Sequence, residues 1–274
     1  MIQNDAVMIA VAPNGARKTR QDHPKIPITP KELALTAAAC HDAGACMLHL
    51  HVRDEKLLHS LDVERYREAI QAIRRQVGEE LIIQVTTEAV GIYNREQQIQ
   101  MVTQLRPEAV SLAIREISPI GVDEKVSADF FSFLQREHIA PQYILYDRQD
   151  ILHFNELLKR GIIPHENVSI LLVLGRYAEN QQSDVEDLAP LLSPLTDVQH
   201  WSLCAFGSSE ANCMIEAIRH GGHCRVGFEN NLLLADGTTA KDNSALVRAV
   251  SDAATTLHKK VASADAARKL LGMR

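Results

Sequence analysis

Short apolar runs alternate with amphipathic segments from one end of this chain to the other. Each run is rich in aliphatic residues, passes into a polar turn, and is followed by a segment in which apolar residues recur at helical spacing. This alternation predicts βα units around a parallel sheet. The expected strands are residues 6–12, 45–52, 81–86, 109–114, 142–146, 168–174, 199–205 and 222–228.

The segments that follow these strands carry the signals of helices. Thr29 and Pro30 suit the start of the first helix, because threonine caps free backbone N–H groups and proline is tolerated at the first helical position. Gly44 suits its end. The expected helices are residues 30–43, 62–77, 94–105, 126–138, 148–160, 184–192, 208–220 and 243–259.

Eight strands alternating with eight helices in 274 residues predict an α/β fold of the (β/α)8 class, the TIM barrel. A doubly wound sheet would usually carry a glycine-rich phosphate loop after its first strand, and residues 13–17 lack that pattern. No linker, low-complexity tract or sequence repeat divides the chain, so we expect one domain over residues 1–274. In such a barrel, catalytic groups stand at the carboxyl ends of the strands.

Composition excludes several classes of function. Hydrophobic residues make up 46% of the chain and charged residues 23%, and the net charge of −6 leaves no basic excess for binding nucleic acid. The aliphatic runs are far shorter than a membrane span, and Asp5 stands where a signal peptide carries basic residues. We therefore expect a cytoplasmic protein that binds neither nucleic acid nor membrane. The five cysteines form no C-x-x-C pair and are expected to be reduced thiols.

Two histidines, His49 and His51, end the second predicted strand. Side chains two positions apart on a strand point to the same face, so both imidazoles should face the mouth of the barrel. They form half of a site for zinc or another transition metal, and a catalytic zinc commonly takes a third protein ligand. The alternative is a pair of hydrogen-bonded histidines without a metal.

Two charged residues lie at the end of the eighth predicted strand. Glu229 is the natural third ligand, because a closed barrel places strand eight only two strands from the histidines. Arg225 lies within the strand, where a charge is costly unless it meets a carboxylate, a metal-bound anion or an acidic substrate. A purely structural ion pair is the alternative for Arg225.

Polar residues follow several other predicted strands as well. Glu88 and Glu116, after the third and fourth strands, are candidates for general acid/base catalysis, or else ion-pair partners for nearby arginines. The candidate substrate-binding residues at the same rim are Asn14, Arg17, Thr86, Arg115 and Arg176.

Five segments together resemble a known family. They are residues 12–16 (APNGA), 49–54 (HLHVRD), 85–87 (VTT), 173–175 (VLG) and 225–231 (RVGFENN). In this order the chain resembles the β-keto acid cleavage enzyme family over nearly its whole length. The resemblance implies a zinc-dependent TIM barrel that condenses a β-keto acid with acetyl-CoA and releases acetoacetate and a new CoA thioester.

The resemblance also implies roles for individual residues. His49, His51 and Glu229 would be the ligands of one zinc ion per chain. Arg225 matches an arginine of the family and would share with zinc the stabilisation of developing oxyanions. The family further suggests a homo-oligomer, a tetramer or a dimer.

This chain departs from the family pattern at the rim. Asn230 occupies the catalytic position at which the family typically has an aspartate, and an amide cannot take up a proton at neutral pH. The same rim gains Glu88 and Glu116, and Arg17 and Arg176 stand where family members have other residue types. We infer a divergent branch in which Glu88 or Glu116 transfers the proton and the arginines recognise an anionic substrate.

Two other functions fit the same residues, because fold and motif do not fix the reaction. A metal-dependent aldolase, lyase or hydrolase could polarise a carbonyl substrate without CoA. Loss of the aspartate also fits a degenerate barrel that binds an anionic metabolite without turnover. A metal held by the three ligands together with thioester turnover would distinguish the first function from both.

Overall fold

The computed structural model describes residues 6–164, 167–196 and 198–273. Asp5, on which the cytoplasmic prediction partly depends, lies outside these ranges. Within them, no helix is long and apolar enough to cross a membrane.

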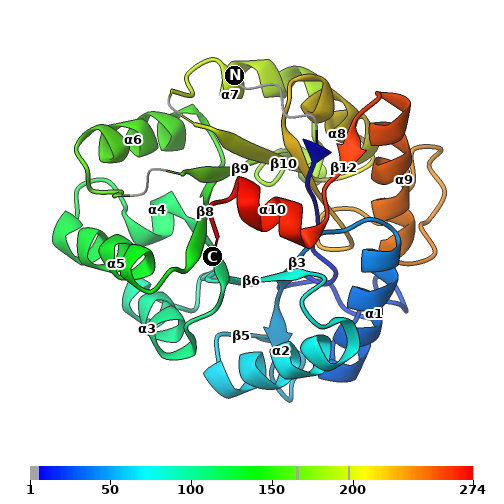
Figure 1. The fold of residues 1–274 in the computed structure, drawn as a ribbon, viewed down its shortest axis with the longest axis horizontal. Coiled ribbons are helices and arrows are strands. Elements are labelled where there is room, and N and C mark those ends of the chain that lie inside the picture. Colours follow the sequence, from blue (N-terminus) through cyan, green and yellow to red (C-terminus); the bar gives the residue numbers. More distant parts are fainter. Residues whose placement is uncertain (1–5, 165–166, 197, 274) are drawn as a thin grey trace.

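Eight parallel strands close a barrel at the centre of the molecule (Figure 1). Each strand pairs with the next along the chain, and the last pairs with the first through Cys224 and Ile9. This closed parallel barrel confirms the predicted (β/α)8 fold. Its strands are β2 (Ile9–Val11), β3 (Met47–Leu50), β6 (Ile82–Thr86), β7 (Ala109–Ala113), β8 (Ala140–Leu145), β9 (Ser169–Leu174), β10 (His200–Ala205) and β11 (His223–Val226).

Helices surround the barrel, one after each strand, as Figure 1 shows. Thr29 caps the first of them as predicted: its hydroxyl accepts from the backbone N–H of Glu32, whose carboxylate accepts in return from the Thr29 N–H. The main helices are α1 (Pro30–Asp42), α2 (Val63–Val77), α3 (Arg95–Leu105), α5 (Glu124–Arg136), α6 (Arg148–Lys159), α7 (Leu188–Leu192), α8 (Glu210–Arg219) and α9 (Asn243–Thr256).

Short elements complete the two ends of the barrel. At the amino ends of the strands, α10 (Ala264–Leu270) packs on Met47 and Ile82, and β12 (Lys260–Val261) pairs with β1 (Ala6–Val7). At the carboxyl ends, β4 (Val52–Arg53) and β5 (His59–Ser60) form an antiparallel hairpin directly after β3. The hairpin therefore lies beside the predicted histidine pair.

Some predicted boundaries are wrong for local reasons. Strand 109–114 ends at Ala113, because Ile114 begins the short helix α4 (Ile114–Ile117). Strand 222–228 ends at Val226, because Gly227 has a φ of 136°. Helix 184–192 begins only at Leu188, after a 3₁₀ turn, since Pro190 is tolerated only in the first turn of a helix.

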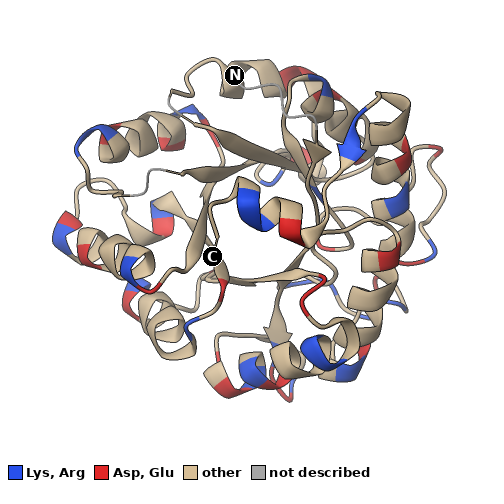
Figure 2. Cartoon of the chain, in the orientation of Figure 1, with Lys and Arg blue, Asp and Glu red and all other residues tan. Residues whose placement is uncertain are grey.

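Charged residues lie mainly outside the barrel of strands. Figure 2 shows lysine, arginine, aspartate and glutamate mainly on the outer helices and loops, whereas the central strands carry few of them. The charged side chains that do lie inside, such as Arg225, are therefore exceptions that need a partner.

Candidate active site

The two predicted histidines meet at the carboxyl end of β3. His49 lies within the strand and His51 directly follows it, so both imidazoles point the same way. Their Nε2 atoms are 3.1 Å apart, and both side chains are buried. Burial and the neighbouring Arg225 guanidinium hold the pKa of His49 well below its usual value, which keeps its ring nitrogen available as a ligand.

Glu229 completes the cluster from the turn after β11. Its Oε2 atom lies 3.3 Å from His51 Nε2 and 3.7 Å from His49 Nε2. The carboxylate packs against Gly15, where an added Cβ would lie only 2.5 Å from Glu229 Cγ. Gly15 also has a φ of 59°, so the first loop needs glycine here both for its backbone conformation and for the approach of Glu229.

Arg225 holds the other side of this carboxylate. Its Nη2 donates to Glu229 Oε1 over 2.9 Å; the Arg225 side chain is only 5% exposed and that of Glu229 is 14% exposed. Burial alone would raise the pKa of Glu229, but Arg225 and the two histidines more than offset it, so that pKa lies well below its usual value. The Nε and Nη1 groups of Arg225 have no hydrogen-bond partner among the described residues, which leaves them free for a ligand.

The three side chains fit a divalent transition metal. One nitrogen from each histidine and one Glu229 oxygen lie within 4.8 Å of one another. With the separations given above, the nearest point equidistant from these three atoms is about 2 Å from each, which is the length of a zinc–nitrogen or zinc–oxygen bond. Glu229 Oε2 is buried and has no hydrogen-bond partner among the described residues, as expected of an atom reserved for a metal. Two histidines and one glutamate are a donor set that catalytic zinc uses.

Two residues that the sequence analysis did not single out contact the outer nitrogens of the histidines. His49 Nδ1 lies 2.9 Å from Gln84 Oε1, on the neighbouring strand β6. His51 Nδ1 lies 3.5 Å from Nδ1 of His59, on the hairpin. A polar amide among the aliphatic residues 82–85 is a signal in the sequence that points to Gln84. His59 has no such signal, because it follows no ligand spacing.

A small pocket opens beside this cluster. His49, Arg225 and Glu229 line it together with aromatic and aliphatic side chains. The remaining lining residues are Thr86, Glu88, Ile144, Tyr146, Val173, Arg176 and Phe206. Two of the three candidate metal ligands, His49 and Glu229, thus line one pocket with Arg225 and a further carboxylate, Glu88, at the carboxyl end of the barrel.

Glu88 reaches this pocket between two arginines. Its Oε1 accepts from Arg17 over 2.8 Å and from Arg176 over 3.2 Å. The Glu88 backbone N–H donates to the hydroxyl of Thr86, which fixes the turn after β6. The guanidinium of Arg176 also lies over the ring of Phe206, at 5.3 Å. Four of the predicted rim residues are therefore placed together.

Comparison with known proteins identifies the family. The model of the beta-keto acid cleavage enzyme family matches residues 6–273. The chain belongs to this family. A 3-keto-5-aminohexanoate cleavage enzyme from Fusobacterium nucleatum is 29% identical over 98% of this chain and 99% of its own length. A 3-oxoadipate:acetyl-CoA acetyltransferase from Cupriavidus necator is also 29% identical, over 97% of this chain and 94% of its own.

Solved structures agree on the fold. The apo structure of ObcA superposes with a TM-score of 0.75 at 15% identity, over 91% of this chain and 66% of that chain. At this identity the match supports the TIM barrel alone. Family membership, by contrast, makes the chain an enzyme of the β-keto acid cleavage class.

In this β-keto acid cleavage enzyme, two predicted rim residues lie apart from the pocket. The start of α4 turns Arg115 toward α6, where it bonds Asp147 over 2.6 Å and Asp150 over 2.7 Å. The carboxylate of Glu116 accepts from Gln98 over 2.7 Å, behind the β6 turn. Burial raises the pKa of Glu116, but neither Arg115 nor Glu116 is among the residues that line the pocket.

The two asparagines have different surroundings. Asn14 Nδ2 donates to the carbonyl oxygens of Pro27 and His51, so it supports the backbone that presents a histidine. Asn230 is buried, and neither its amide nitrogen nor its amide oxygen has a partner among the described residues. It follows Glu229 directly but does not line the pocket.

A buried acid that the sequence did not single out lies next to this turn in the β-keto acid cleavage enzyme. Glu210, at the start of α8, is only 2% exposed and accepts from Asn231 Nδ2 over 3.1 Å. Burial raises its pKa to about 8, against the opposing effect of the Asn231 hydrogen bond. The positive charges of Arg225 and of Lys18, which donates to the backbone oxygen of Glu229 over 2.6 Å, also oppose this rise in the pKa of Glu210.

This raised pKa predicts a pH-dependent stability. The folded state holds the Glu210 proton up to about pH 8, whereas the unfolded state loses it near its ordinary value of 4.5, so this group's contribution to stability falls as the pH rises between those values. Between about pH 6 and about pH 9 the parent should lose about 3 kcal/mol relative to Glu210→Gln in urea unfolding. Glu216→Gln, on the same helix, is the control. Equal pH dependence in the parent and Glu210→Gln would contradict the prediction.

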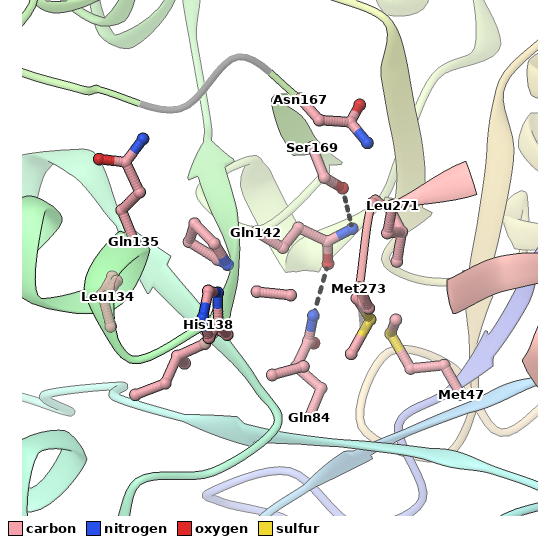
Figure 3. A pocket seen from close by; sticks show the side chains of 15 residues that line it. Met47, Gln84, Leu134, Gln135, His138, Gln142, Asn167, Ser169, Leu271 and Met273 are labelled. Atoms are coloured by element: carbon pink, nitrogen blue, oxygen red, sulfur yellow. Dashed lines mark hydrogen bonds between the residues drawn. The ribbon is translucent and has the colours of Figure 1, made fainter. Parts of the chain in front are cut away.

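A larger cavity, of about 360 Å³, lies at the opposite, amino end of the barrel (Figure 3). Figure 3 shows Gln84, Gln142 and Ser169 joined by hydrogen bonds of 3.2 and 3.4 Å across the barrel interior. Since Gln84 also contacts His49, polar side chains connect this cavity to the histidine cluster. No metal-ligand cluster or pair of facing charges lines it among the described residues.

Proposed function

We propose that the chain is a zinc-dependent acyltransferase that cleaves a β-keto acid with acetyl-CoA as co-substrate. The observation that carries the proposal is the His49–His51–Glu229 cluster in a member of this family, with two of its residues lining a pocket that Arg225 and Glu88 also line. A similar protein from Cupriavidus necator is named for acetyl transfer between acetyl-CoA and a β-keto acid.

The proposed reaction exchanges one carbon–carbon bond for another. Carbon 2 of the β-keto acid loses a proton and attacks the carbonyl carbon of acetyl-CoA, which expels the CoA thiolate. The thiolate then attacks carbon 3, the bond between carbons 2 and 3 breaks, and the acyl fragment leaves as a new thioester. Carbon 2 recovers a proton and departs as acetoacetate, so one group can perform both proton transfers.

The residues of the pocket have the chemistry for these steps. A zinc ion on His49, His51 and Glu229 would supply a Lewis acid that polarises the keto group and acidifies the proton on carbon 2. Arg225 has N–H groups without partners and can donate them to a developing oxyanion. Glu88 is the pocket carboxylate that is not a candidate ligand, and we assign to it the proton transfer.

The charges around the pocket point to an anionic side chain on the substrate. Among the described residues, Arg17, Arg176 and Arg225 form ion pairs with only two carboxylates, Glu88 and Glu229, and a divalent metal would add further positive charge. This excess favours a β-keto acid with a second negative group beyond the carboxylate that defines it. Arg176 is placed to contact that group, because it lines the pocket and Arg225, the other arginine that lines it, is assigned to the developing oxyanion.

A panel of three substrates tests the proposal. Zinc-loaded protein is assayed for acetoacetate and new acyl-CoA with acetyl-CoA and a β-keto acid whose side chain is anionic (3-oxoadipate), neutral (3-oxohexanoate) or cationic (3-keto-5-aminohexanoate). We expect kcat/KM to be highest for the anionic side chain, by about tenfold or more over the cationic one, because like charges repel in the pocket.

Each other result has a definite meaning. Breakdown of the keto acid when acetyl-CoA is omitted would favour a metal-dependent aldolase, lyase or hydrolase instead. Tight binding of the keto acid without product would favour a degenerate binding barrel, which the buried, partnerless Asn230 also fits. Preference for the cationic side chain would contradict the assigned roles of Arg17 and Arg176.

Two further parts of the proposal concern the metal and the assembly. Elemental analysis of untagged protein should find about one zinc per chain, because the three ligands form one site. The family resemblance leads us to propose a homo-oligomer, a dimer or tetramer, which light scattering tests. The cytoplasmic location stays a prediction from the sequence.

A further inference from the structure

The outer nitrogen of His51 faces a second imidazole. His51 Nδ1 and His59 Nδ1 are 3.5 Å apart, and the two ring centroids are separated by 5.2 Å. Both rings are buried, with His51 fully covered and His59 only 4% exposed. Two bare nitrogens, or two N–H groups, facing each other in such a place would be unfavourable, so one ring must donate and the other accept.

The far side of His59 decides which ring donates. His59 Nε2 lies 2.9 Å from the backbone carbonyl oxygen of Glu88, an atom that can only accept. His59 therefore carries its proton on Nε2, and its Nδ1 is the acceptor. His51 must then carry its proton on Nδ1, so the lone pair of its Nε2 is directed toward Glu229 and His49. In the metal-free protein this lone pair can accept from His49 Nε2, 3.1 Å away, because Gln84 can pair with either tautomer of His49.

We propose that His59 is a positioning residue that fixes His51 in the tautomer required of a metal ligand. The inference deepens the proposed function, because it concerns the same histidine cluster. An imidazole that binds a metal through one ring nitrogen carries its proton on the other nitrogen. A hydrogen-bond acceptor at that N–H group orients the ring. Here the backbone carbonyl of Glu88 determines the tautomer of His59, and His59 in turn determines the tautomer of His51.

The contact at the outer nitrogen of His49 does not fix the tautomer of that ring. Gln84 presents an amide, whose oxygen and nitrogen can exchange places, so Gln84 can satisfy either tautomer of His49. The carbonyl of Glu88 cannot be reversed in this way. Among the described contacts to the two outer ring nitrogens, only the one through His59 imposes a direction on the proton.

The first test reads the tautomers directly. Long-range ¹H–¹⁵N NMR of the imidazoles, recorded at mildly alkaline pH, distinguishes an Nδ1–H ring from an Nε2–H ring. We expect Nδ1–H for His51 and Nε2–H for His59, in the metal-free and the zinc-loaded protein. The opposite assignment for either ring would overturn the proposal. Because this spectrum needs no zinc and no substrate, it decides the matter even if the proposed function fails.

The second test measures zinc affinity by competition with a chelator. His59→Leu removes the acceptor and should weaken zinc binding about 10- to 100-fold. His59→Asn places a carbonyl oxygen near the position of Nδ1 and should recover most of that loss. His153→Leu is the matched control, because His153 also lies 2.6 Å from a backbone carbonyl, that of Ser118, but does not contact the cluster. Equal affinity in His59→Leu and the parent would overturn the proposal.

Discussion

Replacement of Glu229 by glutamine should eliminate tight zinc binding and lower turnover about 10³-fold or more. Removal of the carboxylate takes away one of three candidate ligands and leaves the metal without the charge that balances it. A loss of several kcal/mol of transition-state stabilisation by the metal corresponds to that change in rate. Zinc content by elemental analysis and initial rates of acetoacetate formation measure the two effects.

The same substitution should destabilise the metal-free protein. Arg225 would remain buried opposite a neutral amide, and an uncompensated buried charge costs about 3–5 kcal/mol. Glu108→Gln is a suitable control, because Glu108 accepts from Arg74 and Arg268 at the amino end of the barrel, away from the ligands. It should keep full zinc content and turnover. Full zinc content in Glu229→Gln would refute the proposed site.

Replacement of Glu88 by glutamine should lower kcat about 100-fold while zinc content stays at the parent level. The glutamine keeps the shape of the side chain and its contact to Arg17 and Arg176, but it can no longer accept the proton from carbon 2 of the substrate. A positioned general base contributes about this much or more to a rate. Steady-state kinetics over a range of pH are the measurement.

Glu116→Gln is the matched comparison for this experiment. Glu116 lies behind the same turn, where it accepts from Gln98, and does not line the pocket. We expect it to change kcat much less than Glu88→Gln does. A larger loss of kcat in Glu116→Gln than in Glu88→Gln would assign the proton transfer to Glu116 instead. Full turnover in both variants would mean that neither carboxylate is the base.

The fold and the histidine cluster follow from local features of the sequence. The alternation of apolar runs with helical periods predicted the eight strands, because each strand buries one face against the helices and one in the barrel. Spacing of two along a strand placed His49 and His51 on one face, and barrel closure brought Glu229 to them. These inferences need only the period of a strand and the order of strands around a barrel.

Other contacts depend on geometry that periodicity does not encode. Arg115 was expected at the substrate pocket, but the short helix α4, which the sequence did not predict, begins at Ile114 and turns Arg115 toward Asp147 and Asp150. Glu210 is an ordinary acidic residue at a helix start, and only the packing of the β11 turn buries it. His59 owes its place to the hairpin after β3, whose register no local pattern indicated.

The larger cavity at the amino end of the barrel has a consequence for inhibitor discovery. A compound chosen to fill this cavity would bind next to Gln84 and Gln142, at the opposite end of the barrel from the histidines. It would compete with neither proposed substrate, and any inhibition would arise by displacing the interior amides. Chelating fragments with a second anionic arm are the better starting compounds, since they match the narrow pocket that holds the ligands and Arg176.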